Sequence, residues 1–303
     1  MNVLDLYTKL YSALKTWNIV PVWVLSPFRR IIRVIANKHI VHYFKAKHHI
    51  RKKSYSGDIV VSLTSFPARI NSVWQVVECM LHQTCSPQKI ILWLSSEQFI
   101  NKKNIPDNLQ SLQSDIFEIR LVSGDIKSHK KYYYVSKEYP SKKIVLIDDD
   151  IYYPTNFLEK LDKYFEKYKT ITAFYGCLIT RDKTGELTPY TSWTSLFDEM
   201  DNDDFFFGSG GGVIFVPNLL FKDLTNISLA LKLCPSADDI WLNAMVRLSG
   251  LKVHKLKSGP LLPIIQKDNS GTLSVVNVGM DKNDIQLCAI NKYYMGKMGV
   301  KVF

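Results

Sequence analysis

The chain has 303 residues, of which 46% are hydrophobic and 12% aromatic, so it can form a sizeable core and is not intrinsically disordered. Its five cysteines are odd in number and include no Cys-x-x-Cys pair, which excludes a disulfide framework and a cysteine zinc site and favours a reducing compartment. The net charge of +11 is concentrated in residues 1–57, which have eleven basic side chains and one acid, so residues 58–303 carry only +1.

Residues 1–57 are therefore expected to form a basic, amphipathic extension to a body made of residues 58–303. Apolar side chains recur in the extension at near-helical spacing. The apolar stretch 19–25 is interrupted by Pro21 and is far shorter than the roughly 20 residues that a membrane-spanning helix needs. The extension also lacks the pattern of a signal peptide.

Two arrangements of this extension stay open. In one, Trp17, Trp23 and Phe28 enter the interface of an anionic membrane, to which the basic side chains are attracted. In the other, a helical arm packs on the body and turns its basic face to water. No known nucleic-acid-binding motif accompanies the charge, so nucleic acid is not an expected partner. The expected location is the cytoplasm, peripheral to the inner face of the cell membrane.

The first part of the body predicts strands that alternate with helices. Apolar, β-branched runs favour strands, and apolar residues three or four apart favour helices. Strands are expected at 58–63, 90–94, 116–122 and 144–147, and helices at 73–82 and 130–137. This alternation predicts a parallel, three-layer α/β sheet.

The second part of the body has shorter elements. A helix is expected from about residue 154 to 168, with Thr155 or Asn156 as its cap. Short strands are expected at 171–175, 188–193, 213–216 and 251–256, and helices at 239–248 and 283–295. A glycine-rich segment, 208–212, lies between two of these strands, and residues 257–282 are rich in loops.

Three consecutive acids, Asp148-Asp149-Asp150, follow the apolar run 144–147. A buried strand tolerates no unpaired charge, so the carboxylates must lie just beyond its C-terminal end, where open α/β sheets bind ligands. Side chains alternate along an extended chain, so Asp148 and Asp150 are expected on one side and Asp149 on the other. Carboxylates bind hard divalent cations, and Mg²⁺ is often held by one or two of them together with substrate phosphates. The alternative is a solvated acidic turn.

Two further features carry candidate chemistry. The run Gly208–Gly212 is nearly without side chains, so another chain or a sugar can approach its backbone closely; the alternative is a flexible turn or bulge. Asp238 and Asp239 begin a predicted helix, and one of them is expected to cap it. His254, alone on an apolar strand, is interpreted as a packed core residue rather than a metal ligand.

The order of these motifs resembles that of the nucleotide-sugar glycosyltransferases of the GT-A fold, especially bacterial family 2-like enzymes of surface-polysaccharide synthesis. The resemblance covers about residues 57–295. It rests on a strand ending in Thr64-Ser65, an Asp125 loop, the Asp-x-Asp, the glycine-rich segment and the sequence 237–242 (Ala-Asp-Asp-Ile-Trp-Leu). It implies a three-layer α/β/α sandwich with a mostly parallel sheet, a donor half at about 58–150 and an acceptor half at about 151–303.

The resemblance also implies a metal-dependent transfer of a sugar from a nucleotide-diphosphate donor, most simply a UDP-sugar, to a saccharide or lipid-linked acceptor. Mn²⁺ or Mg²⁺ would be held by Asp150 and Asp148. Asp239 would be the base that deprotonates the acceptor hydroxyl, with Asp238 as second choice, and such a base favours inversion. The Gln/Arg-x-x-Arg-Trp sequence of processive synthases is not present.

Other residues receive roles by the same resemblance, each beside a plainer interpretation. The implied donor-binding residues are Thr64, Ser65, Arg69, Asp125, Lys130, Asp148 and Asp149, and the implied sugar-contacting residues are Gly210, Gly211, Gly212 and Trp241. Arg69 is alternatively a surface residue and Asp125 a turn residue. Lys130 and Lys131 either face the diphosphate or form a solvated pair, and Trp241 is otherwise a core residue.

Two other functions share some of these features. Haloacid-dehalogenase-type phosphohydrolases also place an Asp-x-Asp after a strand, but on the first strand of their core and with Thr or Val two residues later. Here three predicted strands come earlier and Tyr152 takes that position. The remaining alternative is a non-catalytic protein that retains the fold.

Overall fold

A computed structural model describes residues 2–16, 22–47, 58–100, 104–266 and 282–303. In the described part of the chain the main sheet has eight strands in the order β3-β2-β1-β4-β11-β6-β12-β9. Its strands are β1 (Ile59–Thr64), β2 (Lys89–Ser95), β3 (Phe117–Val122), β4 (Lys143–Leu146), β6 (Ile171–Ala173), β9 (Met200–Asp201), β11 (Val213–Phe215) and β12 (Val253–Lys255).

The pairing of these strands is mostly parallel. β1 lies between β2 and β4 and is parallel to both, with Val61 opposite Ile90 and Val145. β11 is antiparallel to β4 and β6, and β9 is antiparallel to β12. The expected α/β fold with a mixed, mostly parallel central sheet is therefore confirmed.

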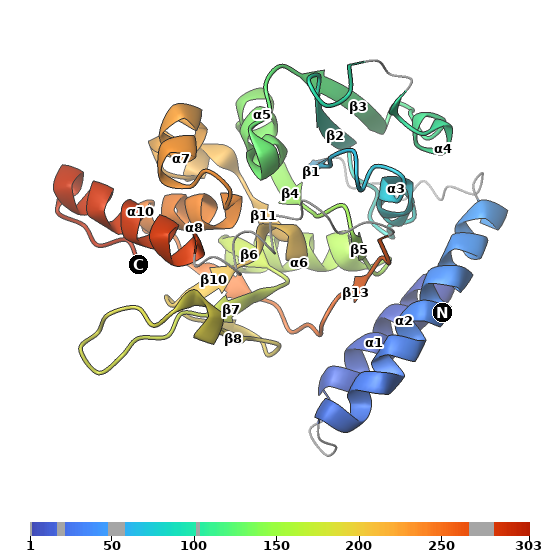
Figure 1. Ribbon diagram of the computed structural model, residues 1–303, viewed down its shortest axis with the longest axis horizontal. Coiled ribbons are helices and arrows are strands. Elements are labelled where there is room, and N and C mark those ends of the chain that lie inside the picture. Colours follow the sequence, from blue (N-terminus) through green and yellow to red (C-terminus); the bar gives the residue numbers. More distant parts are fainter. Residues whose placement is uncertain (1, 17–21, 48–57, 101–103, 267–281) are drawn as a thin grey trace.

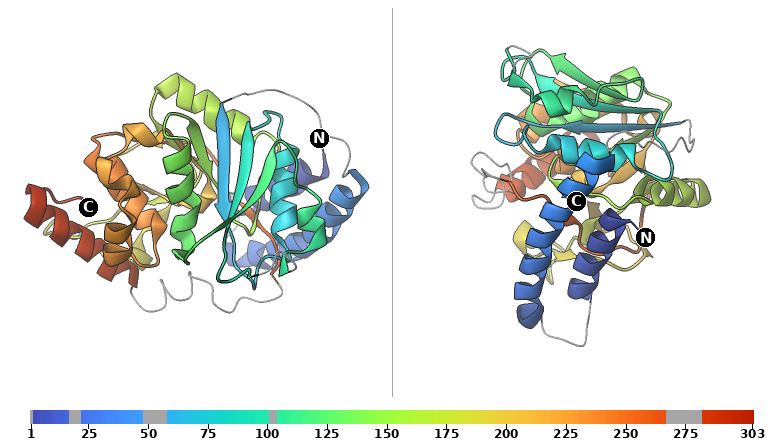
Figure 2. Two further views of the ribbon diagram at one scale, coloured as in Figure 1. Left: turned by 90° about the horizontal axis from the view of Figure 1, so that it is seen from above. Right: turned by 90° about the vertical axis from the view of Figure 1, so that its right-hand side faces the viewer.

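Helices cover both faces of this sheet (Figures 1 and 2). Side chains alternate along each strand, so Val61 and Leu63 of β1 belong to one buried cluster and Val60 to the other. The first cluster includes residues of α3 (Val73–Leu81), α4 (Asp107–Gln110) and α6 (Phe157–Tyr168). The second includes residues of α5 (Lys130–Glu138), α7 (Ile227–Leu233), α8 (Asp238–Leu248) and α10 (Lys282–Met298).

Two small sheets complete the body. One joins β10 (Phe205–Phe207), β7 (Gly176–Leu178) and β8 (Thr194–Ser195), and the other pairs β13 (Leu262–Pro263) with β5 (Ile151–Tyr152). The strand expected at 188–193 is wrong, because Tyr190–Ser192 form a 3₁₀ turn and β8 begins only at Thr194. Trp193 fills a buried position there beside Phe206, so the apolar pattern of this segment reflects packing rather than a ladder.

The N-terminal residues form a helical hairpin of α1 (Val3–Thr16) and α2 (Val22–Lys47) beside the body (Figure 1). Leu4, Ala36, Ile40 and Phe44 are fully buried and belong to the same hydrophobic cluster as α3 and β1. The described residues of the hairpin thus pack on the body, and membrane contact through their outer side stays a prediction. Trp17 and the side chain of Trp23 lie outside them.

Polar contacts fix the hairpin in place. Both carboxylate oxygens of Asp5 accept hydrogen bonds from Thr155, one from its backbone N–H at 2.9 Å and one from its hydroxyl at 2.8 Å. Asn156 holds the N-cap position of α6, but neither it nor Thr155 caps the helix through its own side chain. The N–H of Leu158 in the first turn of α6 donates instead to Oε1 of Gln83 at 2.9 Å, so a glutamine from earlier in the chain replaces the cap expected from the sequence. None of the described helices is long and apolar enough to cross a membrane.

Candidate active site

A cavity of about 490 Å³ opens at the C-terminal edge of β1 and β4. It is lined by backbone and side chains from β1, the loop before α5, the segment after β4 and the start of α8. Of the residues implicated by sequence, those that line it are Thr64, Ser65, Arg69, Asp125, Lys130, Lys131, Asp148, Asp149, Asp150, Asp238 and Asp239. Segments widely separated in sequence thus meet at the sheet edge where ligand binding was expected.

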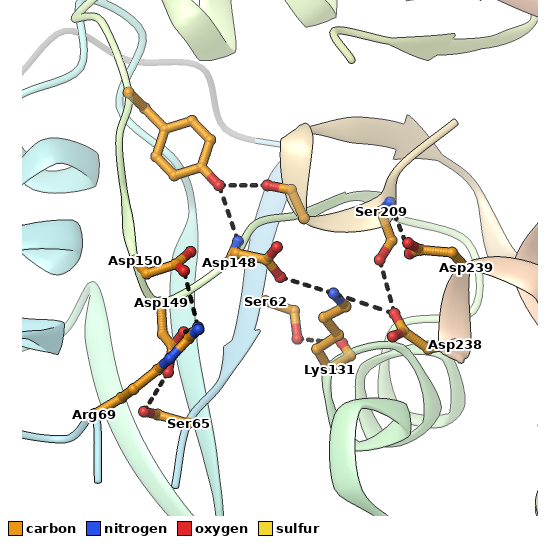
Figure 3. Close-up of polar contacts among 12 residues, drawn as sticks. Ser62, Ser65, Arg69, Lys131, Asp148, Asp149, Asp150, Ser209, Asp238 and Asp239 are labelled. Carbon is orange, nitrogen blue, oxygen red and sulfur yellow. Dashed lines mark hydrogen bonds and ion pairs between the residues drawn. The ribbon is translucent and has the colours of Figure 1, made fainter. Parts of the chain in front are cut away.

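The side chains of the three acids after β4 do not point alternately to opposite sides, as they would in an extended strand. The chain turns at Asp149 and Asp150, and Nη1 of Arg69 lies 2.9 Å from a carboxylate oxygen of each (Figure 3). Asp149 is buried and also accepts a hydrogen bond from the Ser65 hydroxyl at 2.5 Å. Asp148 pairs instead with Lys131. Arg69 is accordingly a cavity residue, and the acids are not a solvated turn.

Negative charge is in excess around Asp150. Its pKa is raised to about 7 by burial and by the neighbouring carboxylates Asp148 and Asp149, despite the opposing effect of Arg69. Burial likewise raises the pKa of Asp149, although Arg69 and Ser65 favour its charged form. For Arg69, the attraction of Asp149 and Asp150 outweighs burial and raises the pKa. One guanidinium does not fully compensate this group of acids.

Lys131 joins the two acidic regions of the cavity. Its Nζ lies 2.9 Å from Oδ1 of Asp148 and 3.1 Å from Oδ2 of Asp238, and only 5% of its side chain is exposed. Burial disfavours the charged form, but the two carboxylates outweigh it and raise its pKa. Lys130 is also buried and pairs with Asp125. The solvated-pair interpretation of the two lysines is therefore wrong.

Asp238 and Asp239 differ although they are neighbours. Asp238 is buried, and its Oδ2 accepts a hydrogen bond from the Ser209 hydroxyl at 2.7 Å as well as the Lys131 contact. Burial opposes its ionisation, yet Lys131 and His129 outweigh that effect and lower the pKa. Asp239 is only partly buried and accepts a hydrogen bond from the Ser209 N–H at 2.9 Å. Burial and the charge of Asp238 raise its pKa to about 7.

Neither aspartate caps α8 by a side-chain hydrogen bond, so that expectation is wrong. Instead, Ser209 donates a hydrogen bond to each carboxylate, from its N–H to Asp239 and from its hydroxyl to Asp238 (Figure 3). The sequence interpretation did not single out this serine. It lies in the short 3₁₀ turn Ser209–Gly211, which runs directly before β11. The position of this serine inside the glycine-rich segment was the only sequence signal that could have drawn attention to it.

The glycine-rich segment is close-packed rather than flexible. Gly210, Gly211 and Gly212 are all buried. A Cβ at Gly210 would lie 1.7 Å from Oδ2 of Asp148, so the group that approaches this backbone is the Asp148 carboxylate, and the contact with a sugar stays a prediction. The N–H of Asp148 donates to the Gly210 carbonyl at 3.2 Å and also to the Tyr153 hydroxyl oxygen at 2.9 Å. The segment therefore sets the position of Asp148.

Three other sequence-based assignments have definite positions. Trp241 is fully buried and its Nε1 donates to the Leu224 carbonyl at 3.1 Å, so it lies in the core and not on the acceptor side of the cavity. His254 is packed, as expected, with its ring 3.8 Å from that of Tyr168. Asp125 combines both interpretations, because it lines the cavity and also accepts from the Lys127 N–H in a turn.

The fit to a metal ion depends on the chemistry of these donors. The described residues include no group of three or more His, Cys, Asp or Glu side chains that could hold a metal ion by themselves. Asp148 and Asp150 nevertheless offer the hard oxygen ligands with which Mg²⁺ or Mn²⁺ is held when phosphate oxygens and water complete the shell. The pKa of Asp150 is raised by burial and by repulsion from Asp148 and Asp149, and a bound cation would oppose both effects. The residues present therefore fit a cation shared with a phosphate ligand.

No known family model matches this sequence. No curated protein matches it either. Similar solved structures include S. aureus TarS 1–349 in complex with UDP-GlcNAc, with 9% identity, a TM-score of 0.47 and coverage of 78% of this chain and 72% of that chain. Another is 4-diphosphocytidyl-2C-methyl-D-erythritol synthase from Anaerococcus prevotii, with 14% identity, a TM-score of 0.41 and coverage of 76% and 96%. These likenesses concern the α/β fold alone.

Proposed function

We propose that this protein is a metal-dependent glycosyltransferase that moves a sugar from a nucleotide-diphosphate donor to an acceptor hydroxyl. The observation that supports this most is the contrast between Asp238 and Asp239. One carboxylate is held ionised by Lys131, and its neighbour has a pKa near 7 and is open to the same cavity as the Asp-x-Asp. Adjacent acids whose environments separate their pKa values mark acid–base chemistry.

At the donor end, Asp148 and Asp150 are proposed to hold Mn²⁺ or Mg²⁺, which when bound supplies positive charge for the diphosphate leaving group. Arg69 orients Asp149 and Asp150, and Lys131 orients Asp148. Thr64 and Ser65 at the end of β1, together with Asp125 and Lys130, are the proposed contacts for the nucleoside side of the donor, since they line the same cavity.

At the acceptor end, Asp239 is proposed to take the proton from the attacking hydroxyl. A base works best when its pKa is close to the operating pH, and a value of about 7 meets that condition. The Ser209 N–H fixes the carboxylate, and Asp238 is occupied by Lys131 and the Ser209 hydroxyl. Attack by an activated hydroxyl displaces the diphosphate directly, so we expect inversion at the anomeric carbon.

The proposed donor is a UDP-sugar, and the proposed acceptor is a saccharide or a lipid-linked saccharide. The proposed place of action is the inner face of the cell membrane. The charge distribution supports this location, because residues 1–57 carry a net charge of +10 and residues 58–303 carry only +1.

A thermal-shift screen of nucleotide-sugars with and without Mn²⁺ tests the donor assignment. A ligand that binds only the folded state raises its stability by about 2.7 kcal/mol at a concentration 100 times its Kd. We expect a UDP-sugar to raise the Tm in the presence of Mn²⁺ and much less in its absence. Asp148→Asn/Asp150→Asn should abolish the metal-dependent part.

The same screen can contradict the proposal. Stabilisation by nucleoside triphosphates and not by nucleotide-sugars would indicate a nucleotidyltransferase. Stabilisation by neither would support a protein that retains the fold without binding a donor. Asp162→Asn/Asp204→Asn, which changes two acids outside the cavity, serves as the matched control for the loss of charge.

A further inference from the structure

The two faces of the N-terminal hairpin have different surroundings. On α2, Ala36, Ile40 and Phe44 recur every four residues and are buried against the body. On the opposite side of the same helix, Phe28 and Ile31 are 56% and 55% exposed. Helical residues separated by three or four positions share one face, so α2 has an apolar stripe on each side.

The outer face concentrates exposed apolar groups. Six of the fifteen exposed large hydrophobic side chains in the described part of the chain belong to the hairpin. They are Leu6, Leu10, Phe28, Ile31, Val34 and Ile35. We call these six residues the outer apolar face. Phe28, Ile31 and Ile35 are three or four positions apart and share one side of α2, and Leu6 and Leu10 are four positions apart on α1. Adjacent exposed apolar side chains, unlike single ones, mark a site of interaction.

The charge around this face has a single sign. Lys9, Arg30, Lys38 and Lys45 are exposed on the same two helices. The only acid among residues 1–57 is Asp5, and both of its carboxylate oxygens accept hydrogen bonds from Thr155 of the body. The hairpin therefore has no acidic side chain to offset its exposed basic ones.

We propose that the outer apolar face binds an anionic lipid bilayer, with α1 and α2 lying in the plane of its interface. Exposed Phe, Ile and Leu side chains enter the boundary between headgroups and acyl chains, and flanking Lys and Arg side chains contact anionic headgroups. A protein partner of the same shape would need a matching acidic surface, whereas an anionic membrane supplies that charge by its composition.

This inference deepens the proposed action at a membrane and bears on the acceptor. The hairpin is attached to the body by a shared core, so a membrane that holds α1 and α2 also holds the catalytic body at its surface. As the views in Figures 1 and 2 show, one end of the hairpin extends past the body. An enzyme fixed in this way meets acceptors that are anchored to lipid more often than acceptors in solution.

Vesicle sedimentation of the full chain tests the proposal. We expect the protein to pellet with phosphatidylglycerol vesicles, much less with phosphatidylcholine vesicles, and less as salt rises, since exposed charges are screened over about 8 Å at physiological ionic strength. Phe28→Ser/Ile31→Ser should abolish pelleting. Arg30→Glu/Lys38→Glu should weaken it by more than the roughly fivefold per basic residue that neutralisation alone would cost.

Matched variants separate the hairpin from general surface properties. Leu219→Ser/Ile285→Ser removes two equally exposed apolar side chains elsewhere, and Lys222→Glu/Lys232→Glu reverses two exposed charges elsewhere. Both should pellet like the wild type, and all four variants should keep the wild-type circular dichroism spectrum. Equal pelleting of the hairpin variants and the controls, or no pelleting of the wild type, would overturn the proposal.

Two further measurements distinguish this proposal from self-association of the chain and from the proposed function. A wild-type mass that doubles with concentration in light scattering, and returns to the monomer in Phe28→Ser/Ile31→Ser, would assign the face to a second copy of the chain. Donor binding is measured separately by thermal shift. A wild-type protein that binds the donor but not the vesicles would reject the membrane proposal alone. A wild-type protein that binds the vesicles but not the donor would reject the glycosyltransferase proposal alone.

Discussion

The two acidic regions of the cavity contain the same residue type in different electrostatic settings. After β4, three carboxylates have Arg69 and a share of Lys131 as cationic partners, and the pKa of Asp150 is raised to about 7. At the start of α8, Lys131 pairs with Asp238 and leaves Asp239 without a cationic partner within contact distance among the described residues. The first region is suited to binding a metal cation, and the second is suited to accepting a proton.

The largest effect should come from Asp239→Asn. If Asp239 is the base, turnover should fall by about 10²–10⁴-fold, because the amide cannot take the acceptor proton. Donor binding should persist, since the amide oxygen can still accept from the Ser209 N–H. Steady-state kinetics and the thermal-shift assay measure the two quantities. Full activity of Asp239→Asn would show that Asp239 is not the base, and it would contradict the proposed difference between the two acidic regions.

The pH dependence sharpens the same comparison. Because the pKa of Asp239 is about 7, wild-type turnover should fall as pH drops through 7 and the carboxylate takes up a proton. The native state holds this proton more tightly than the unfolded state does. The free energy of unfolding should therefore decrease from about pH 4 to pH 7, and Asp239→Asn should exceed the wild type above pH 7 by on the order of 1 kcal/mol or more. A lower stability of this variant at pH 8 would contradict the assignment.

The next effect concerns the residue that connects the regions. Lys131→Met leaves Asp148 and Asp238 without their buried cation, and loss of one partner of a buried pair costs about 3–5 kcal/mol. Denaturant unfolding measures this loss. Lys142→Met is the control, because Lys142 pairs with Asp58 at the surface, where the side chains are 39% and 57% exposed, and such pairs contribute about 1 kcal/mol or less. Equal free energies of unfolding for Lys131→Met and Lys142→Met would mean that Lys131 does not stabilise Asp148 and Asp238.

The smallest effect should come from Gly210→Ala, which changes no charge. The new Cβ would overlap the Asp148 carboxylate, and added atoms in a packed site cost about 1–3 kcal/mol. We expect the displaced Asp148 to weaken Mn²⁺-dependent stabilisation by a UDP-sugar, while the pH dependence of turnover stays near that of the wild type. Gly296→Ala is the control, since its Cβ meets no atom within 4 Å. Unchanged metal dependence would separate Asp148 from the cation site.

The local sequence pattern was enough to predict that Asp148, Asp149 and Asp150 lie at the C-terminal edge of the sheet. The apolar run before Asp148 can be buried only as a strand, and the carboxylates must then lie beyond its end. The partners of these acids could not be predicted in the same way. Asp239 and Ser209 are 30 positions apart, and the hydrogen bond between them depends on how α8 packs against β10 and the turn Ser209–Gly211. The burial of Lys131 likewise follows from tertiary contacts that its own helical spacing does not encode.

The hairpin shows the same division between local and tertiary information. Its helices and its basic character follow from apolar spacing and charge. Which of the two apolar stripes of α2 is buried cannot be read from composition, because Ile40 and Ile31 have the same side chain and opposite surroundings. The packing depends on complementary positions on α3, such as Trp74 beside Phe44, which come later in the chain.

The contact between Asp5 and Thr155 has a consequence for the order of folding during synthesis. The hairpin leaves the ribosome before the body, and Thr155 is made roughly 8–30 s after Asp5 at the usual rate of about 5–20 residues per second. Throughout that interval its inner stripe, with Ile40 and Phe44, has no finished body to cover it. We expect the nascent chain to be most prone to aggregation and to chaperone binding in this window. Ribosome-bound chains stalled before and after α6 should differ sharply in protease sensitivity within α2.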